Sequence, residues 1–485
     1  MHFYNMSIIL RRTAALVLAA AACIAVRAQD GTPTLSLDRC IEIALTESPV
    51  VRVADMEITK ADYSRKETLG ALLPSIDFSG SYGRTLQKQV AYMDMDAFGD
   101  MSKPGTGTGT DEEATPQSRA GDKGGKKDTG FKMGLDNTYS LGFSAAVPLM
   151  APQLWASLKL SDIQIARTVE QARASRLDLV NQVKNAYYAL QLAIDSRRVV
   201  QESYDMARLT HDTYVKRHSA GDASEYEVLR TSVAMKNIEP EMIQGDIAVS
   251  RARMQLAILM GIDADTPYEI EGTLDSYDPE AISAAAVLST DLMNNTSLAM
   301  NDIERRTLEK TLSMQRASLY PTLAATANYS WNSSSNGSPF RNFRWTSYSM
   351  VGLSVSIPLF QGGQRMARIK QARIGLEQIE YTRQNLVRQL NSQVTLAIDN
   401  IRLNEKQIAS SRESVDEAAR AHDIQQRSFQ IGAASYLDLR DSELSLTRAR
   451  LAYCQAVYNF MVAHADLELL LGNAPLPENL TETSR

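Results

Sequence analysis

The side chains that most often carry metal or catalytic chemistry are sparse in this chain and form no recognisable motif. The histidines stand far apart and have no HExxH spacing, and the cysteines have no CxxC spacing. The five histidines are His2, His211, His218, His422 and His464. No combination of nucleophile, base and oxyanion donors can be assembled from the sequence. We therefore predict no enzyme activity, no metal and no cofactor.

The N-terminus has the pattern of an export signal. Two arginines precede a short apolar run, and we expect cleavage between Ala28 and Gln29. The alternative is a lipoprotein in which Cys23 carries the lipid. Removing the signal takes away three arginines and changes the formal net charge from −6 to −9. Such a negative charge argues against nucleic acid as a partner.

Two cysteines remain after cleavage, Cys40 and Cys454, one near each end of the chain. In an oxidising compartment they could form a disulfide. Cysteines in helical segments are more often small buried apolar residues, however, so we expect two free thiols.

The chain repeats itself at an interval of about 210 residues. The segment Leu141–Leu149 (LGFSAAVPL) returns as Val351–Leu359 (VGLSVSIPL). Further along, Gly221 is answered by Gly432, 211 residues later. Each half therefore has one plan, namely a helix, two short strands, a very long helix, a glycine turn and a final helix.

Four segments alternate between apolar and small polar residues, as strands with two different faces do. They lie near residues 76–82, 139–147, 323–331 and 351–357. An apolar face opposite a small polar face suits a barrel wall between lipid and water, although a soluble β-sandwich alternates in the same way. Pro148 and Pro358 mark the junctions from strand to helix.

The connections within the two strand pairs differ in composition. Residues from about 100 to 130 are rich in glycine, threonine, lysine and aspartate, and they bury too little apolar surface to become ordered. We expect a disordered surface loop there. The second connection is shorter, and Asn336-Gly337 indicates a turn.

Two long stretches predict two very long helices. After Pro152, and again after Gln361, the chain has no proline and almost no glycine for about 67 to 70 residues. Such a helix is roughly 100 Å long, too long for the interior of one globular domain. Pro240 interrupts the final helix of the first half, where we expect a kink or break.

The last helix of the second half carries two apolar heptad stripes. The first comprises Leu437, Leu444, Leu451, Tyr458 and Ala465, and the second comprises Leu439, Leu446, Tyr453, Phe460 and Leu467. The two stripes lie about 200° apart around the helix. We therefore expect apolar neighbours on two opposite sides, as in a closed ring of helices.

These signals divide the chain into five parts. They are a signal peptide (1–28), a first repeat (29–261), an equatorial connection (262–290), a second repeat (291–472) and a C-terminal tail (473–485). The first repeat holds a helix, the β-hairpin with the disordered loop and a long helical hairpin.

Four strands cannot close a barrel, and an open sheet edge in lipid leaves backbone groups unpaired at a high cost in free energy. Three chains would supply twelve strands, whereas two would supply eight and leave hardly any lumen. We predict a mainly α fold with a transmembrane β-barrel. Each subunit of a homotrimer would give four strands to a twelve-stranded barrel in outer-membrane lipid and long helices to a periplasmic α-barrel.

The order and spacing of these motifs resemble the TolC-type outer-membrane efflux proteins over nearly the whole mature chain. The markers are Val147-Pro148-Leu149, Ile357-Pro358-Leu359-Phe360 with Gly362-Gly363, and the segments around Gly221 and Gly432. The resemblance implies a passive exit duct of a tripartite efflux or type I secretion system, located in the outer membrane and extending into the periplasm. It also implies that the tip turns at Gly221 and Gly432 dock to a periplasmic adaptor protein, and that an inner-membrane pump supplies the energy.

The resemblance also implies a gate just after the second tip turn. Family members constrict the tunnel entrance with acidic residues, and Asp438 and Asp441 match those two positions. Rings of carboxylates around a narrow water path favour cations. The alternative is that these acids only stabilise the first turn of a helix through its dipole.

Three further positions bear on how the resemblance implies that the tip is closed. Glu227 aligns with a family position that bonds across the closed tip. Phe429 and Ala434 replace polar residues that latch the closed state in other members. We therefore expect a different latch here, with Arg440 as a candidate partner for an acidic neighbour.

Two other classes of protein share some of these features. A periplasmic adaptor has one long helical hairpin flanked by compact β domains, whereas this chain has two hairpins and four barrel-type strands. A structural coiled-coil protein of the envelope requires no such strands. The channel interpretation accounts for both the repeat and the strands.

Overall fold

The computed structural model describes residues 33–91, 131–274, 277, 291–338 and 344–473. The chain divides into a helical unit (Met1–Arg65, Lys159–Leu312 and Lys370–Arg485) and a sheet unit (Lys66–Leu158 and Ser313–Ile369). Several predictions fall outside the described residues. They concern the signal peptide with its Ala28–Gln29 cleavage site, Cys23, the loop at 100–130, and most of the tail and of the equatorial connection.

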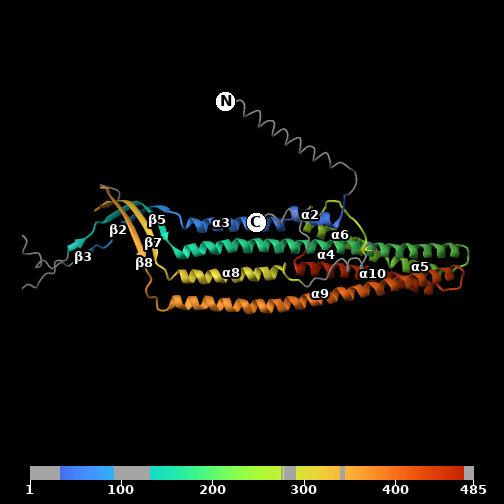
Figure 1. Ribbon diagram of the computed structural model, residues 1–485. Helices are drawn as coiled ribbons and strands as arrows, with labels where there is room; N and C mark the ends of the chain where they lie inside the picture. Colours follow the sequence, from blue (N-terminus) through green and yellow to red (C-terminus); the bar gives the residue numbers. More distant parts are fainter. Residues whose placement is uncertain (1–32, 92–130, 275–276, 278–290, 339–343, 474–485) are drawn as a thin grey trace, which may run out of the picture. The chain divides into compact units, whose positions relative to one another are not determined.

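Four antiparallel strands lie side by side in the sheet unit (Figure 1). In spatial order they are β2 (Ser75–Arg84), β5 (Asn137–Met150), β7 (Thr322–Ser335) and β8 (Thr346–Ser356). The four predicted strands are thus confirmed. Two shorter strands, β3 (Gln89–Ala91) and β4 (Phe131–Met133), pair separately between β2 and β5 in the sequence.

The strand register sorts the alternating residues onto two faces. Residues directly opposite one another in neighbouring strands share a face. Phe78 is paired with Phe143, and Phe143 in turn with Tyr329. On the other face Ser79 is paired with Gly142, and Gly142 with Ser330. One face of the sheet is therefore rich in apolar and aromatic residues, and the other consists mainly of small and polar residues.

The two predicted strand-to-helix junctions lie at the ends of β5 and β8. Pro148 sits where the pairing of β5 with β7 becomes irregular, and helix α4 begins at Pro152. Pro358 follows the end of β8 and precedes Gly362 and Gly363, which have φ of +57° and +81°. These glycines leave the helical region of backbone space, so helix α9 begins at Gln364, slightly later than the sequence predicted.

Helices account for most of the remaining described residues. They are α2 (Leu37–Glu47), α3 (Pro49–Gly70), α4 (Pro152–Ser219), α5 (Glu225–Lys236), α6 (Glu239–Met260), α8 (Thr296–Ala317), α9 (Gln364–Gln430) and α10 (Tyr436–Leu471). The two very long helices are confirmed, because α4 has 68 residues and α9 has 67. None of the helices in the described part of the chain combines the length and apolarity that a membrane crossing needs.

The predicted break near Pro240 is also confirmed. Helix α5 ends at Lys236 and α6 starts at Glu239, so proline occupies the first turn of a new helix. Proline is tolerated there because the first amides of a helix have no partner within the helix.

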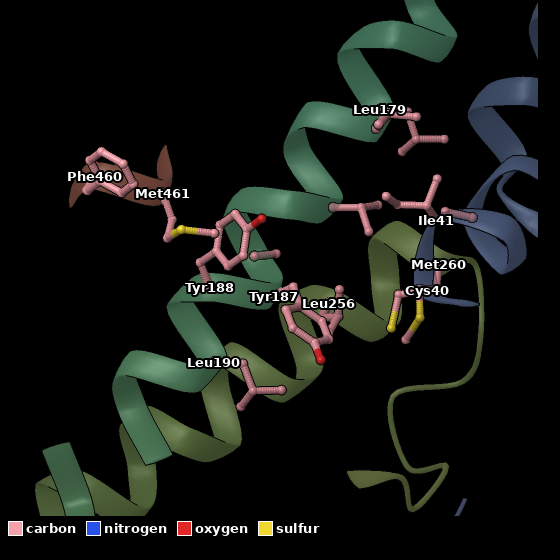
Figure 2. Packing of buried hydrophobic residues seen from close by; sticks show 14 of the residues in the cluster. Cys40, Ile41, Leu179, Tyr187, Tyr188, Leu190, Leu256, Met260, Phe460 and Met461 are labelled. Carbon is pink, nitrogen blue, oxygen red and sulfur yellow. The ribbon is translucent and has the colours of Figure 1, made fainter. Parts of the chain in front are cut away.

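The core of the helical unit forms where α2, α4, α6 and α10 meet (Figure 2). Tyr187, Leu256, Met260 and Phe460 are each at most 2% exposed. The Tyr187 hydroxyl donates to the carbonyl of Glu271 at 2.6 Å, in the segment after the short parallel pair of β1 (Thr34–Leu35) with β6 (Glu269–Ile270). The core thereby joins α2, near the start of the first repeat, and α6, at its end, to α4.

Cys40 and Cys454 are both buried, and neither forms a disulfide in the described part of the chain, as predicted. Cys40 is fully buried in the core, and burial raises the pKa of its thiol to about 12. A thiol that stays protonated at neutral pH is a poor nucleophile. Cys40 therefore serves as a small apolar packing residue.

Helix α10 buries one of its two apolar stripes within the chain. Leu439, Leu446 and Phe460 are at most 4% exposed. On the other stripe Leu437 is 60% exposed, and Leu444 is only half-buried. The side of α10 that carries Leu439 is therefore covered by other parts of this chain. The opposite side is exposed at Leu437, where the helix begins.

Candidate functional site

Two glycine turns end the long helices and reverse the chain in the helical unit. Gly221 follows α4 with φ of +81°, and Gly432 follows α9 with φ of +78°. In each turn an amide donates to a carbonyl five residues earlier, from Asp222 to Arg217 and from Ala433 to Ser428, both at 2.8 Å. We call residues 220–224 the first tip turn and residues 431–435 the second tip turn. The repeat is thus preserved in backbone geometry.

Each tip turn leads into a helix that starts with a capping box. At the start of α5, the Glu227 carboxylate accepts from the Ser224 amide at 2.7 Å, and the Glu227 amide donates to the Ser224 hydroxyl at 3.3 Å. At the start of α10, Asp438 accepts from the Ser435 amide at 3.2 Å and from its hydroxyl at 2.7 Å. Such boxes satisfy amides that have no partner within the helix. Neither box was predicted, although the S-x-x-E and S-x-x-D spacings that signal them are readable in the sequence.

The four predicted gate residues lie in these two helix starts. Asp438 is engaged in its capping box, and Asp441, one turn further along α10, is exposed. Arg440 forms an ion pair with Glu443 at 3.3 Å. The structure therefore brings Asp438, Arg440 and Asp441 onto one short stretch of α10, with Arg440 turned toward Glu443.

Local electrostatics differ between Glu227, at the start of α5, and Glu443, about two turns into α10. Hydrogen bonds from the backbone and hydroxyl of Ser224 lower the pKa of Glu227, so its carboxylate stays ionised. Burial raises the pKa of Glu443, which is 4% exposed, although the neighbouring Arg440 opposes this shift. Glu227 therefore places a fixed negative charge at the start of α5, whereas Glu443, buried on α10, is a carboxylate that is protonated more easily.

The repeat is also seen in two histidines, one in each of the long helices that lead into the tip turns. His211 on α4 lies 3.0 Å from the hydroxyl of Thr231 on α5, and His422 on α9 lies 3.3 Å from the hydroxyl of Ser442 on α10. Both pairs join the two helices of one hairpin. This bracing role was not predicted, because the contact partners of a histidine on another helix cannot be read from the sequence.

Aromatic and arginine side chains gather between the first helical hairpin, formed by α4 and α5, and the second, formed by α9 and α10. Tyr214 of α4 lies 6.1 Å from Phe429 of α9 and 5.8 Å from Tyr436 of α10, measured between ring centroids. The Arg217 guanidinium lies 5.6 Å from the Phe429 ring, and that of Arg230 lies 5.1 Å from the Tyr436 ring. We call these five residues the tip cluster. Of these five residues, only Phe429 was singled out from the sequence, as a departure from the family.

Comparisons with known proteins match most of the chain, including both long helical hairpins and the main sheet. The family model described as outer membrane efflux protein matches residues 40–262 and 287–473. The pyoverdine export outer membrane protein OpmQ of Pseudomonas aeruginosa is 22% identical over 437 residues, which cover 90% of this chain and 85% of OpmQ. The alkaline protease secretion protein AprF of the same species is 23% identical over 353 residues, covering 70% of this chain and 71% of AprF.

The fold is also found among solved structures. The CmeC outer membrane channel of Campylobacter jejuni aligns with a TM-score of 0.66 at 15% sequence identity, covering 93% of this chain and 89% of CmeC. The family match includes both repeats, all four strands of the main sheet and both tip turns. The chain therefore belongs to the outer membrane efflux protein family, whose members are transport channels of the outer membrane.

Proposed function

We propose that three copies of this chain form one exit duct and close a single twelve-stranded β-barrel in outer-membrane lipid. The observation that carries this proposal is the sheet of β2, β5, β7 and β8. Its apolar face is open, since Ile76, Phe78, Val351 and Leu353 are 62–84% exposed. Within the described part of the chain, its outer strands β2 and β8 each pair with one strand only. Pairing β2 of one copy with β8 of the next removes these edges, as a lipid environment requires.

The opposite face of the sheet suits a water-filled path. It carries serine, threonine, asparagine and glycine at most positions, as the register shows. Water-lined barrels combine such an interior with an apolar exterior. The duct itself is passive in this proposal, and the chain acts as a conduit, not as an enzyme.

Asp438 and Asp441 are the proposed gate of this duct. They lie three residues apart at the start of α10, so both side chains point to the same side of the helix. A carboxylate pair repeated in three subunits would favour cations along a narrow path. Glu227 and Arg440 would hold the surrounding turns through their bonds to Ser224 and Glu443.

The tip turns are the proposed docking surface for a periplasmic adaptor protein. A Cβ atom added to Gly221 or Gly432 would meet no other atom within 4 Å, so a partner can approach the backbone closely there. An inner-membrane pump would supply the energy for transport, since we assign no energy-converting chemistry to this chain. OpmQ is named for pyoverdine export and AprF for protease secretion, so this architecture is compatible with small-molecule and protein cargo.

The first test is the oligomeric mass and conductance of the purified protein. We expect a trimer that resists SDS until it is heated, and cation-selective channels in planar bilayers. N-terminal sequencing of the same preparation should begin at Gln29 if residues 1–28 are the signal peptide. A monomer that conducts no ions would refute the duct.

Two substitutions in β8 test the assignment of the sheet faces. Val351 lies on the apolar face and Ser354 on the polar face. Val351→Arg places a charge in lipid at a cost of about 2–4 kcal/mol at the bilayer midplane and should reduce assembly in the outer membrane. Ser354→Arg, the matched control, should assemble normally and lower the cation conductance. Equal assembly of the two variants would contradict the proposed orientation.

A further inference from the structure

We propose that the tip cluster, comprising Tyr214, Arg217, Arg230, Phe429 and Tyr436, positions the acidic start of α10 against the first hairpin. This inference rests on the proposed gate and identifies the side chains that set its geometry. The five residues act on the gate through packing, and none of them is itself a gate carboxylate.

Tyr214 is the centre of the cluster. It is 5% exposed and contacts one ring on each side of the second tip turn. Phe429 lies in the last turn of α9, and Tyr436 is the first residue of α10. A single ring of the first hairpin therefore supports both helices of the second hairpin at the point where the chain reverses.

The two arginines hold the rings from the first hairpin. Arg217 of α4 lies 5.9 Å from the Tyr214 ring as well as 5.6 Å from Phe429, and Arg230 of α5 lies 5.1 Å from Tyr436. A guanidinium within about 6 Å of a ring centroid is attracted by the negative face of the ring. The first hairpin thus contributes one ring and two cations, and the second hairpin contributes two rings.

The packing next to the cluster is not continuous. A pocket of about 190 Å³ opens between α4, α9 and α10, and its lining includes Arg217, Phe429, Leu439 and Glu443. The ring contacts of the cluster therefore join the two hairpins beside a space that side chains leave open. The connection is aromatic where other family members, according to the resemblance, use polar latch residues.

The cluster is directly coupled to the proposed gate by its place in the chain. Asp438 lies two residues after Tyr436, and its carboxylate is fixed to the start of α10 by the Ser435 capping box. A shift of Tyr436 would therefore displace the start of α10, which carries Asp438 in its first turn and Asp441 one turn further along. The cluster thereby sets how far these acids stand from the first hairpin.

Ring-removing and ring-keeping variants test this role. Phe429→Leu and Tyr436→Leu keep apolar volume but remove a ring, whereas Phe429→Tyr and Tyr436→Phe keep the ring. Tyr226→Leu is the matched control, because Tyr226, like Tyr436, lies at the start of a helix that follows a tip turn, but it is 69% exposed and outside the cluster. The first readout is hydrogen exchange of amides 428–442 in the purified full-length protein. The second is time-averaged conductance in planar bilayers.

We expect the two leucine variants at Phe429 and Tyr436 to exchange these amides about fivefold faster, as the loss of one ring pair implies. Conductance should rise in the same variants, and the ring-keeping variants and Tyr226→Leu should match the wild type. Unchanged exchange in both leucine variants overturns the positioning role. Faster exchange with unchanged conductance overturns the link to the gate. If the wild-type protein conducts no ions, the proposed duct fails, and the exchange measurement still decides the positioning role.

Discussion

Paired substitutions at the start of α10 separate two roles of Asp438, namely the attraction of cations to the proposed gate and the capping of the helix. Ser435→Ala removes the hydroxyl that bonds the Asp438 amide and carboxylate but leaves the negative charge. Asp438→Asn removes the charge but keeps an oxygen that can accept from the Ser435 amide and hydroxyl. One variant therefore weakens the helix cap, and the other weakens the electrostatic field.

The expected magnitudes follow from the geometry. Loss of an N-cap hydroxyl costs about 1 kcal/mol, so Ser435→Ala should be measurably less stable in every subunit. A monovalent cation about 4 Å from one carboxylate in bulk water gains about 1 kcal/mol, equivalent to roughly a fivefold preference. Asp438→Asn should therefore lower the ratio of cation to anion permeability about fivefold and leave stability nearly unchanged.

Thermal unfolding by circular dichroism measures the first effect, and the reversal potential in a KCl gradient measures the second. The equivalent box in the first repeat provides the control, since Ser224→Ala should lower stability without changing selectivity. Unchanged selectivity in Asp438→Asn would show that the acid only caps the helix. An equal loss of selectivity in Ser435→Ala would show that the effect of the charge is indirect.

Three further predictions concern stability. Gly472→Ala should cost clearly more than Gly432→Ala; both residues have positive φ, but only at Gly472 does an added Cβ approach a backbone atom, the Asn294 oxygen, within 2.1 Å. Unfolding titrations will measure this difference, and equal costs would contradict it. The second prediction concerns Glu443, whose pKa burial raises above its value in the unfolded chain. Its contribution to the free energy of unfolding is therefore fully present at low pH and is lost as pH rises through the pKa of the folded state. The stability of Glu443→Gln relative to wild type, followed by thermal unfolding, should therefore be higher at pH about 8 than at pH about 4, and a pH-independent difference would refute this. Phe460→Ala should destabilise the fully buried core by about 3–5 kcal/mol in denaturant titrations, and a cost below about 1 kcal/mol would show that the core does not depend on this ring.

The sequence was sufficient to predict the type and extent of the main elements. Period-two alternation predicted all four strands of the main sheet, and the absence of proline and glycine predicted both ends of α4 and the end of α9. These signals are local, because they depend on how successive side chains point along a single strand or helix. The glycine turns are likewise a local requirement, since Gly221 and Gly432 both need positive φ.

Contacts between distant segments were decided only by the tertiary structure. The sequence did not indicate that β5 would pair with β7, nearly two hundred residues away, nor that α10 would bury the stripe of Leu439 and leave Leu437 exposed. The tip cluster was equally hidden, because Tyr214, Phe429 and Tyr436 come from three helices and do not follow the 211-residue offset that relates Gly221 to Gly432. Periodicity records which face of an element is apolar, but the neighbour that covers this face depends on packing among all the elements at once.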